Sequence, residues 1–561
     1  MVKVHVKRGA TKMPPQRRRV IITITSLVWS SLIIVNLASM PMKAYITETL
    51  PWDLSSSADF NRTFDSFDDM RTRTLAHLTQ RFDRHMFAPS SLARDSSSYA
   101  LRYTLDLPLN TSRCFGQLVR FPGVVFFGPG LTRFCCAFLA QNASMRFATM
   151  AAGTAFECQD ARTLGVPFAS MCLWITPSNE SANRTWLDVH FGVVNYESDT
   201  FAYGKWTIRC LLVVYILQEL WFRYYMSCTA LFRALKRYGL NNTATDPVLD
   251  TYRLDLGDPT CILLSNPIVS AVFVVDIWYS VDYIVLAGVR VTQFDDMWQY
   301  VLGCLYGSRA VWCAYFGLRY LTYIVKRCHW ERHFAPLDPG VLVIVVTLYC
   351  GPIFTYIGHS GLLELLQYLL TFVPASRVLE SIEIAPLCLN LMVLIATLPL
   401  MYSLAYEWYS SRRQQSQYHD GRQLSREALY SHASFNDVKT RVVFACMDRI
   451  HAKSLTRDCR GGSIYYVYER HPHYQRFPLI SHRGVDCFVT CLTEAGSTRY
   501  HLSLLCCLDR HAYKRATPLC QVHPCQSVFV LDCDGNDVAC ASTKDAPISL
   551  HGGIDASPWV L

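Results

Sequence analysis

Charged residues are scarce in this sequence. Only 17% of its 561 residues are Asp, Glu, Lys or Arg, whereas soluble domains usually carry about 25%. Hydrophobic residues make up 51%, and the mean hydropathy is +0.15. This balance argues against an ordinary soluble domain and favours a membrane protein.

The sequence also lacks the signatures of common enzymes. It contains no GxSxG, HExxH, P-loop or GxGxxG motif. The C-terminal part has ten cysteines at irregular spacings, including Cys487 with Cys491 and Cys520 with Cys525, a pair that has His523 between its members, whereas zinc sites usually use two tight C-x2-4-C pairs. Buried reduced thiols explain this pattern better, and we expect no enzymatic activity, no metal and no cofactor.

The net charge of +9 is not distributed as in a nucleic-acid-binding protein. Seven of the first 19 residues are basic (MVKVHVKRGATKMPPQRRR), and other basic clusters flank hydrophobic segments. Basic residues placed in this way orient membrane helices. We therefore expect the lipid bilayer as a partner and no nucleic acid.

Six windows of roughly 20 apolar residues predict a six-helix transmembrane bundle. The windows are Val20–Met40, Trp206–Met226, Asn266–Val289, Met297–Leu318, Leu337–Ile357 and Ile384–Tyr406. The first follows three arginines without a convincing cleavage site, so we interpret it as an uncleaved signal anchor, with a cleaved signal peptide as the alternative.

The connections between these windows predict the orientation. Basic residues concentrate in the connections assigned to the cytosol (Arg233, Lys236, Arg237, Arg253; Lys326, Arg327, Arg332), and the short opposite connections hold only Arg290 and Arg377. This asymmetry follows the positive-inside rule. It places both termini in the cytosol, with the protein in the plasma membrane or a secretory-pathway membrane.

Glycosylation sequons support the same orientation. Five of six N-x-S/T sequons lie between the first two windows, at Asn61, Asn110, Asn142, Asn179 and Asn183. The same region contains Cys114, Cys135, Cys136, Cys158 and Cys172. In an oxidising compartment four of these could form two disulfides, and a bond between the adjacent Cys135 and Cys136 would be strained.

We therefore expect an α-helical membrane region, an α+β extracytosolic domain and a strand-rich cytosolic domain. The predicted units are a basic N-terminus (1–19), a first span (20–40), a glycosylated domain (42–205), five further helices (206–406), a linker (407–430) and a cytosolic domain (431–561). A short apolar segment, residues 361–377, is either a re-entrant half-helix or an amphipathic helix on the outer surface.

Three charged residues are predicted to share one layer inside the membrane. At 1.5 Å per residue, Asp276 and Arg309 lie roughly 20 and 18 Å from the outer ends of adjoining helices. Glu219 lies at a similar predicted depth. Asp282 is nearer the outer face and has no evident basic partner, which favours an external vestibule. Such groups either stabilise helix packing or mark an ion path or sensor.

Two resemblances accompany these patterns. The overall layout, with TWLDVHFGVVNY at residues 185–196, resembles polycystin- and mucolipin-type cation channels, although the pore signature and the repeated arginines of voltage sensors are missing. Residues 256–350, including LGDPTCILLSNPIVSAVFVVDIWYSVDYIVLAGVRV and MWQYVLGCLYGSRAVWCAYFGL, are similar to uncharacterised polytopic membrane proteins of oomycetes. That resemblance implies a membrane protein and no particular activity.

Two functions remain open from the sequence. The first is conduction or sensing of a small ion through the layer of Glu219, Asp276 and Arg309. The second is a membrane receptor or scaffold that binds a protein partner through the external domain or the tail, with purely structural intramembrane charges. A homo-oligomer is compatible with both.

Overall fold

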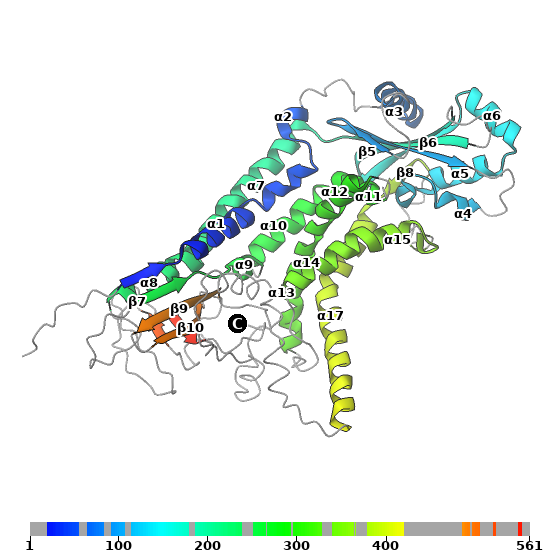
Figure 1. Ribbon diagram of the computed structural model, residues 1–561. Coiled ribbons are helices and arrows are strands. Elements are labelled where there is room, and N and C mark those ends of the chain that lie inside the picture. Colours follow the sequence, from blue (N-terminus) through cyan, green and yellow to red (C-terminus); the bar gives the residue numbers. More distant parts are fainter. Residues whose placement is uncertain are drawn as a thin grey trace, which may run out of the picture.

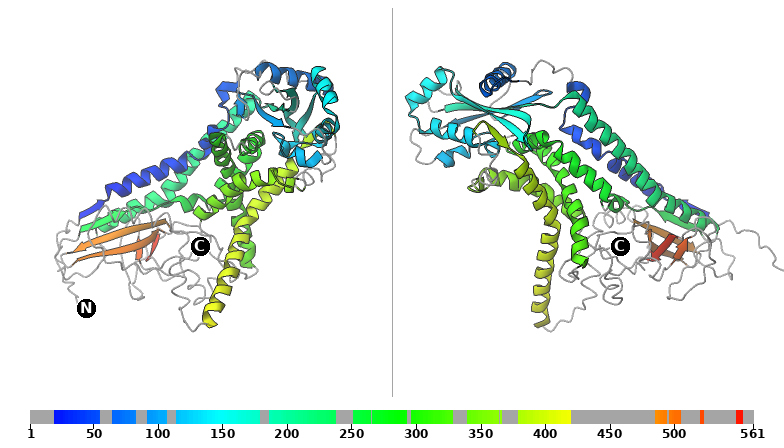
Figure 2. Two further views of the ribbon diagram at one scale, coloured as in Figure 1. Left: turned by 45° about the vertical axis from the view of Figure 1, so that its right-hand side comes forward. Right: turned by 180° about the vertical axis from the view of Figure 1, so that it is seen from behind.

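The computed structural model describes residues 19–54, 64–82, 91–106, 114–178, 186–237, 251–264, 266–292, 296–327, 339–363, 365, 379–419, 485–493, 496–504, 520–522 and 548–552. Its strands form two six-stranded sheets, which we call sheet A and sheet B. The two sheets lie at opposite ends of a set of long helices (Figures 1 and 2).

Sheet B organises the region between the first two predicted spans. In spatial order it contains β2 (Ser91–Arg94), β3 (Ser98–Asp106), β6 (Trp186–Asn195), β5 (Val166–Pro177), β4 (Phe156–Thr163) and β8 (Ser381–Glu383). Neighbouring strands are antiparallel except β4 and β8, which are parallel. Strand β8 lies about 220 residues further along the chain than β4, so the sheet connects the predicted external domain to the segment before the last long helix.

The two faces of sheet B pack against different helices because side chains alternate along a strand. On β6, Val189 and Phe191 face a core shared with α4 (Cys114–Leu118), η3 (Val124–Phe126) and α5 (Pro129–Ala140). The opposite face packs on α3 (Phe67–Arg81) through Leu78. Helix α6 (Ala143–Ala151) begins at Asn142, whose side-chain oxygen accepts a hydrogen bond from the Met145 backbone N–H at 2.9 Å, as N-cap residues do.

Two disulfides stabilise this domain, as the cysteine content predicts. Cys114 bonds Cys136, and Cys158 bonds Cys172 across the paired strands β4 and β5. Cys135 is the remaining thiol, and burial raises its pKa, so it stays protonated and unreactive.

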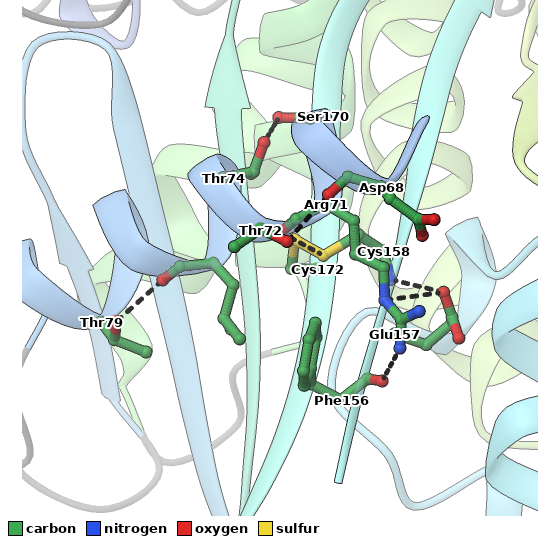
Figure 3. The surroundings of a disulfide bond; sticks show 11 residues. Asp68, Arg71, Thr72, Thr74, Thr79, Phe156, Glu157, Cys158, Ser170 and Cys172 are labelled. Atoms are coloured by element: carbon green, nitrogen blue, oxygen red, sulfur yellow. Dashed lines mark hydrogen bonds and ion pairs between the residues drawn. A yellow bond between two sulfur atoms is a disulfide. The ribbon is translucent and has the colours of Figure 1, made fainter. Parts of the chain in front are cut away.

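Figure 3 shows how α3 lies over the Cys158–Cys172 bond. The Arg71 guanidinium stacks on the Phe156 ring at 4.5 Å and donates a hydrogen bond to its carbonyl oxygen at 3.1 Å. Thr74 and Ser170 share a hydrogen bond of 3.2 Å between their hydroxyls. The Cys158–Cys172 disulfide therefore lies in the interface between α3 and sheet B.

The remaining helices connect the two sheets. They are α1 (Ile24–Ala38), η1 (Pro41–Ile46), α2 (Pro51–Leu54), α7 (Asp199–Leu220), η4 (Trp221–Tyr225), α8 (Met226–Arg237), α9 (Thr260–Leu264), α10 (Pro267–Trp278), α11 (Val281–Arg290), α12 (Met297–Gly307), η5 (Ser308–Ala310), α13 (Val311–Arg327), α14 (Pro339–Leu348), η7 (Tyr349–Ile353), α15 (Phe354–Gly358) and α17 (Ala385–His419). Two of them, η4 and η7, are π-helical turns. Helix α17 extends through residues 407–419, where the sequence predicts a linker.

The prediction of a six-helix transmembrane bundle is wrong. Among the described residues, only α7 and α17 are long and apolar enough to cross a membrane by themselves. The number rises to four if two bent pairs, α1 with Pro41–Leu54 and α10 with α11, each count as one span. The described part of the chain therefore has two candidate membrane helices, and at most four candidate spans.

Local breaks explain the difference. The window Asn266–Val289 bends by 74° between α10 and α11, and every residue of α11 except the partly buried Ile284 is buried, packing with the core of sheet B. The window Val20–Met40 begins as a strand, Arg19–Ile22, and Leu337–Ile357 is interrupted by η7, which contains Pro352. Hydropathy averaged over a window does not detect such breaks, because they depend on packing against other segments.

Sheet A joins segments from the whole length of the chain. Strand β1 (Arg19–Ile22) runs parallel to β7 (Thr251–Asp255), which pairs with β9 (Val485–Thr493). Strands β10 (Gly496–Leu504), β12 (Ile548–Gly552) and β11 (Cys520–Val522) complete the sheet. The N-terminal strand and the C-terminal strands therefore belong to one unit. Most of segment 361–377 lies outside the described residues.

Helices α13 and α17 pack closely at Gly317, which gives a first prediction. A Cβ atom at Gly317 would lie 2.4 Å from the Ala396 carbonyl oxygen, whereas a Cβ at Gly204 on α7 would meet no atom within 4 Å. We expect Gly317→Ala to lower the free energy of unfolding by about 1–3 kcal/mol through overpacking. The matched Gly204→Ala change should raise it by about 0.5–1 kcal/mol through helix propensity. Denaturant unfolding in detergent measures both, and equal effects would contradict the close contact.

Candidate functional site

Six charged side chains meet where the sheet B domain contacts α7 and α10. Glu48 follows η1, Glu197 follows β6, Lys205 and Arg209 lie on α7, Asp276 on α10 and Arg309 in η5. We call these six residues the junction cluster. Five have side chains at most 6% exposed, and that of Arg309 is 11% exposed.

Arg209 is the centre of the junction cluster. Its guanidinium donates to both oxygens of Glu48, at 2.6 and 2.9 Å, and to Asp276 Oδ1 at 2.9 Å. It also donates to the Ser280 hydroxyl at 3.2 Å and lies 4.8 Å from the Tyr45 ring centroid. A planar guanidinium suits such a fork of acceptors, so Arg209 holds the η1 segment, α7 and α10 together.

Arg309 engages the same two carboxylates from another direction. It donates to Glu48 Oε1 at 3.0 Å and forms a short ion pair with Asp276 Oδ2. The Tyr306 hydroxyl donates a hydrogen bond of 2.6 Å to Glu48 Oε1. Both arginines thus share both acids, and the four charges form a closed ring of ion pairs.

Lys205 extends the junction cluster to the end of β6. Its Nζ lies 2.5 Å from Glu197 Oε1 and 3.7 Å from Glu48 Oε2. The other Glu197 oxygen accepts a hydrogen bond from the Tyr283 hydroxyl at 2.9 Å, and that hydroxyl accepts one from the Thr49 N–H at 3.1 Å. One lysine therefore links α7, α11 and the domain.

The charges within the junction cluster balance, with three acids (Glu48, Glu197, Asp276) against three bases (Lys205, Arg209, Arg309). Burying an ion in a protein costs several kcal/mol unless close partners compensate. Here each charged group has such a partner. The buried Asp282 of α11 also interacts electrostatically with Lys205, so the six residues form a buried clamp of ion pairs between the domain and the helices.

The structure brings Asp276 and Arg309 together, as their similar predicted depths in the membrane indicate. It separates Glu219 from both. Glu219 lies ten residues from Arg209 on α7, roughly 15 Å away along the helix axis, and accepts a hydrogen bond of 2.9 Å from Asn266 Nδ2. Asp282 is buried on α11 beneath the domain, so it does not line an open external vestibule. The depth estimate assumed one straight helix through Asp276 and Asp282, and the 74° bend invalidates that assumption.

Sequence reasoning missed Glu48 and gave Arg209 no role. Arg209 lies near the end of its apolar window, where a long side chain can reach the headgroups, and Glu48 lies outside every predicted helix. The position of Arg209 in an apolar helix was the one indication in the sequence, because a basic residue in such a helix favours a nearby acidic partner. Only the fold shows which acid supplies it.

The other end of α7 is fastened to sheet A. The π-turn η4 carries Tyr224, whose hydroxyl accepts a hydrogen bond of 2.7 Å from the Gly257 N–H, just after β7. The neighbouring Tyr225 hydroxyl lies 2.6 Å from the Ser30 hydroxyl of α1. Arg253 on β7 donates to Thr23, the residue after β1, at 2.8 Å. Helix α7 and its continuation therefore contact sheet B at one end and sheet A at the other.

Among the described residues, no group of three or more His, Cys, Asp or Glu side chains could hold a metal ion. The predicted sequons Asn61, Asn110, Asn179 and Asn183 lie outside the described residues, whereas Asn142 is described and exposed. Comparison with protein-family models, with curated proteins and with solved structures finds no match to this chain.

Proposed function

We propose that this protein is an integral membrane receptor whose sheet B domain binds an extracytosolic partner and whose helix α7 transmits that event to sheet A. The observation that carries the proposal is the junction cluster, a buried clamp of ion pairs between the domain and α7. Its carboxylates are occupied by basic side chains of the protein itself, which favours a coupling role over an ion path.

The position of aromatic residues along α7 supports a membrane crossing. Exposed Tyr203 and Trp206 lie near one end, and exposed Trp221 and Phe222 near the other. Tyr203 and Trp221 are 18 residues apart, roughly 27 Å along a helix. This spacing matches a hydrocarbon core of about 30 Å flanked by aromatic side chains at its two interfaces.

Sheet order supports a multi-pass topology. A sheet does not cross a lipid bilayer as an open structure, so sheets at opposite ends of α7 belong to opposite sides. Four connections run between them: β1 to β2, β6 to β7, β7 to β8, and β8 to β9. Each must cross an odd number of times, which gives at least four crossings, equal to the upper count of candidate spans.

The disulfides and the basic residues support the orientation. Two disulfides lie in the sheet B domain, and disulfides persist in oxidising compartments. Arg233, Lys236 and Arg253 lie toward sheet A, on the side where cytosolic basic residues are expected. We therefore place sheet B outside and sheet A in the cytosol.

Glycosylation at Asn142 tests this orientation. The exposed Asn142 belongs to the sequon Asn142-Ala143-Ser144 at the start of α6. We expect Ser144→Ala to remove one glycan while leaving Asn142 as the helix cap, and Ser144→Thr to retain it. Intact mass before and after glycosidase treatment measures the difference. An unglycosylated Asn142 in protein that carries a glycan at Asn241, the sixth sequon, which lies in the sequence between α8 and β7, would reverse the orientation.

Hydrogen–deuterium exchange tests the coupling. Lys205→Met leaves Glu197 without its ion pair at the outer end of α7. If α7 couples the two ends, the Leu256 and Gly257 amides, which donate to Ser26 and Tyr224, should exchange about tenfold faster, equivalent to about 1.4 kcal/mol of lost local stability. The neighbouring Gly204→Ala variant keeps the junction cluster and should leave these amides unchanged.

Ion flux into proteoliposomes distinguishes the ion-conducting alternative. The receptor proposal predicts no flux through the wild-type protein across several ions and voltages. Flux that disappears in a folded Asp276→Asn protein would overturn it. If Lys205→Met speeds amide hydrogen exchange only in residues around the junction cluster, and not at Leu256 and Gly257, the proposed transmission through α7 is contradicted.

A further inference from the structure

A partly open apolar cavity of about 110 Å³ lies beside the junction cluster. One water molecule needs only about 10–15 Å³ of such space, and cavities with apolar walls remain dry and accept apolar ligands. The walls come from α11, α12, α13, η7 and α17, with Phe126 of the sheet B domain on one side. The cavity therefore lies where the domain, the bent helix pair and α17 meet.

Close backbone contacts shape two of the walls. A Cβ at Gly288 on α11 would lie 2.7 Å from Phe126, so the domain presses directly on the helix there. A Cβ at Gly307 would lie 2.9 Å from Cys350 Cβ, at the point where η5 begins beside η7. The π-turn displaces the helix locally, as such turns often do at binding sites. The absence of a side chain at Gly288 and Gly307 therefore lets Phe126 and Cys350 approach these two helices closely.

The surroundings of the cavity indicate what reaches it. Next to the lining residues Cys388 and Met392 on α17 stand the exposed Leu389 and Val393, and next to Tyr349 stands the exposed Leu348. At each of these places, one side chain lines the cavity and the side chain of the adjacent residue is exposed on the outside of the helix. In a membrane the outside of such helices contacts acyl chains.

We propose that this cavity binds the terminal methylenes of a membrane phospholipid acyl chain. The lining is apolar apart from the Arg309, Tyr306 and Tyr349 side chains and the cysteine thiols, which suits an uncharged hydrocarbon. Both Arg309 and Tyr306 also contact Glu48. A bound acyl chain therefore packs against Arg309, which belongs to the junction cluster, and against Tyr306, which donates a hydrogen bond to it. The inference goes beyond the receptor proposal and does not depend on it.

Photolabelling tests the site. Purified protein is reconstituted with phosphatidylcholine that carries a diazirine near the end of one acyl chain, irradiated, and mapped by mass spectrometry at residue level. We expect label at Cys350 and Met392 inside the cavity, and at the exposed Leu211 on α7 as an internal reference. Cys388→Leu fills the cavity from α17 and should lower label at Cys350 about tenfold relative to Leu211, because the chain loses the burial of roughly two methylenes.

Two further variants keep the test decisive. Ala310→Val fills the cavity from the wall beside Arg309 and should act like Cys388→Leu, so loss of folding in one filler leaves the other. Cys210→Leu is the matched control, because Cys210 lies on α7 away from the cavity, and it should change neither label. Label at Leu211 without label at Cys350, or label at Cys350 that survives a folded filler, would overturn the proposal. Filler-sensitive label from diazirine palmitic acid alone would overturn the assignment to a phospholipid.

Discussion

Replacing Arg209 with methionine should lower the free energy of unfolding by about 3–5 kcal/mol, because it leaves Glu48 and Asp276 buried with one arginine between them. Arg209 and Glu48 are each only 1% exposed, so water cannot replace the lost partner. Methionine approximates the length of the aliphatic stem, and the change therefore removes the charge more than the packing. Denaturant unfolding in detergent micelles, followed by tryptophan fluorescence, measures the loss.

A second substitution shows whether charge balance is the cause. Arg209→Met leaves the junction cluster with three acids and two bases, and adding Asp276→Asn restores two of each. We expect the double variant to be more stable than the sum of the single losses by about 0.5–3 kcal/mol, the range of coupling between residues in contact. Strictly additive losses would show that Arg209 and Asp276 stabilise the protein independently.

Removing the Cys158–Cys172 disulfide should produce the second large effect. The bond closes a short loop, with a sequence separation of 14, and loss of such a cross-link costs about 3 kcal/mol in the chain-entropy description. Both cysteines are fully buried against α3 and the sheet (Figure 3). We expect the Cys158→Ala/Cys172→Ala protein to unfold at lower denaturant concentration and to lose protection from hydrogen exchange in α3 first.

Reduction is the matched control for this change. Added together with denaturant, a thiol reductant should lower the unfolding midpoint of the wild-type protein further than that of the double variant, because the variant retains only Cys114–Cys136 of the two described disulfides. The Cys114→Ala/Cys136→Ala protein keeps the β4–β5 bond, and exchange in its α3 should stay slow. Equal loss of protection in α3 from either pair would contradict the local role assigned to Cys158–Cys172.

We propose that the sheet B domain and the helices form a single mechanical unit. The supporting contacts run from Glu197 through Lys205 on α7 to Tyr224 and Gly257. At one end the contacts are buried ion pairs, and at the other they are hydrogen bonds to the backbone after β7. A helix fastened at both ends can transmit a displacement, which a helix surrounded only by lipid cannot.

Local sequence patterns were sufficient for several features. The scarcity of charge and the apolar runs indicate a membrane protein, because burial in lipid depends on composition over about 20 residues. The five cysteines between the first two windows predict two disulfides and one remaining thiol, and the structure has that arrangement. The short connection between the third and fourth windows places Asp276 near Arg309, and they form an ion pair.

Tertiary contacts decided the rest. The bend at Ser280 arises where α11 packs into the core of sheet B, so no count of apolar residues reveals it, and it changes both the number of candidate spans and the position of Asp282. The partners of Arg209 come from residues 161 and 67 positions away, and sheet A joins β1 to strands more than 450 residues later. Hydrophobicity and helix periodicity are properties of neighbouring residues, whereas ion pairing, helix breaks and sheet order depend on which distant segments the fold brings into contact.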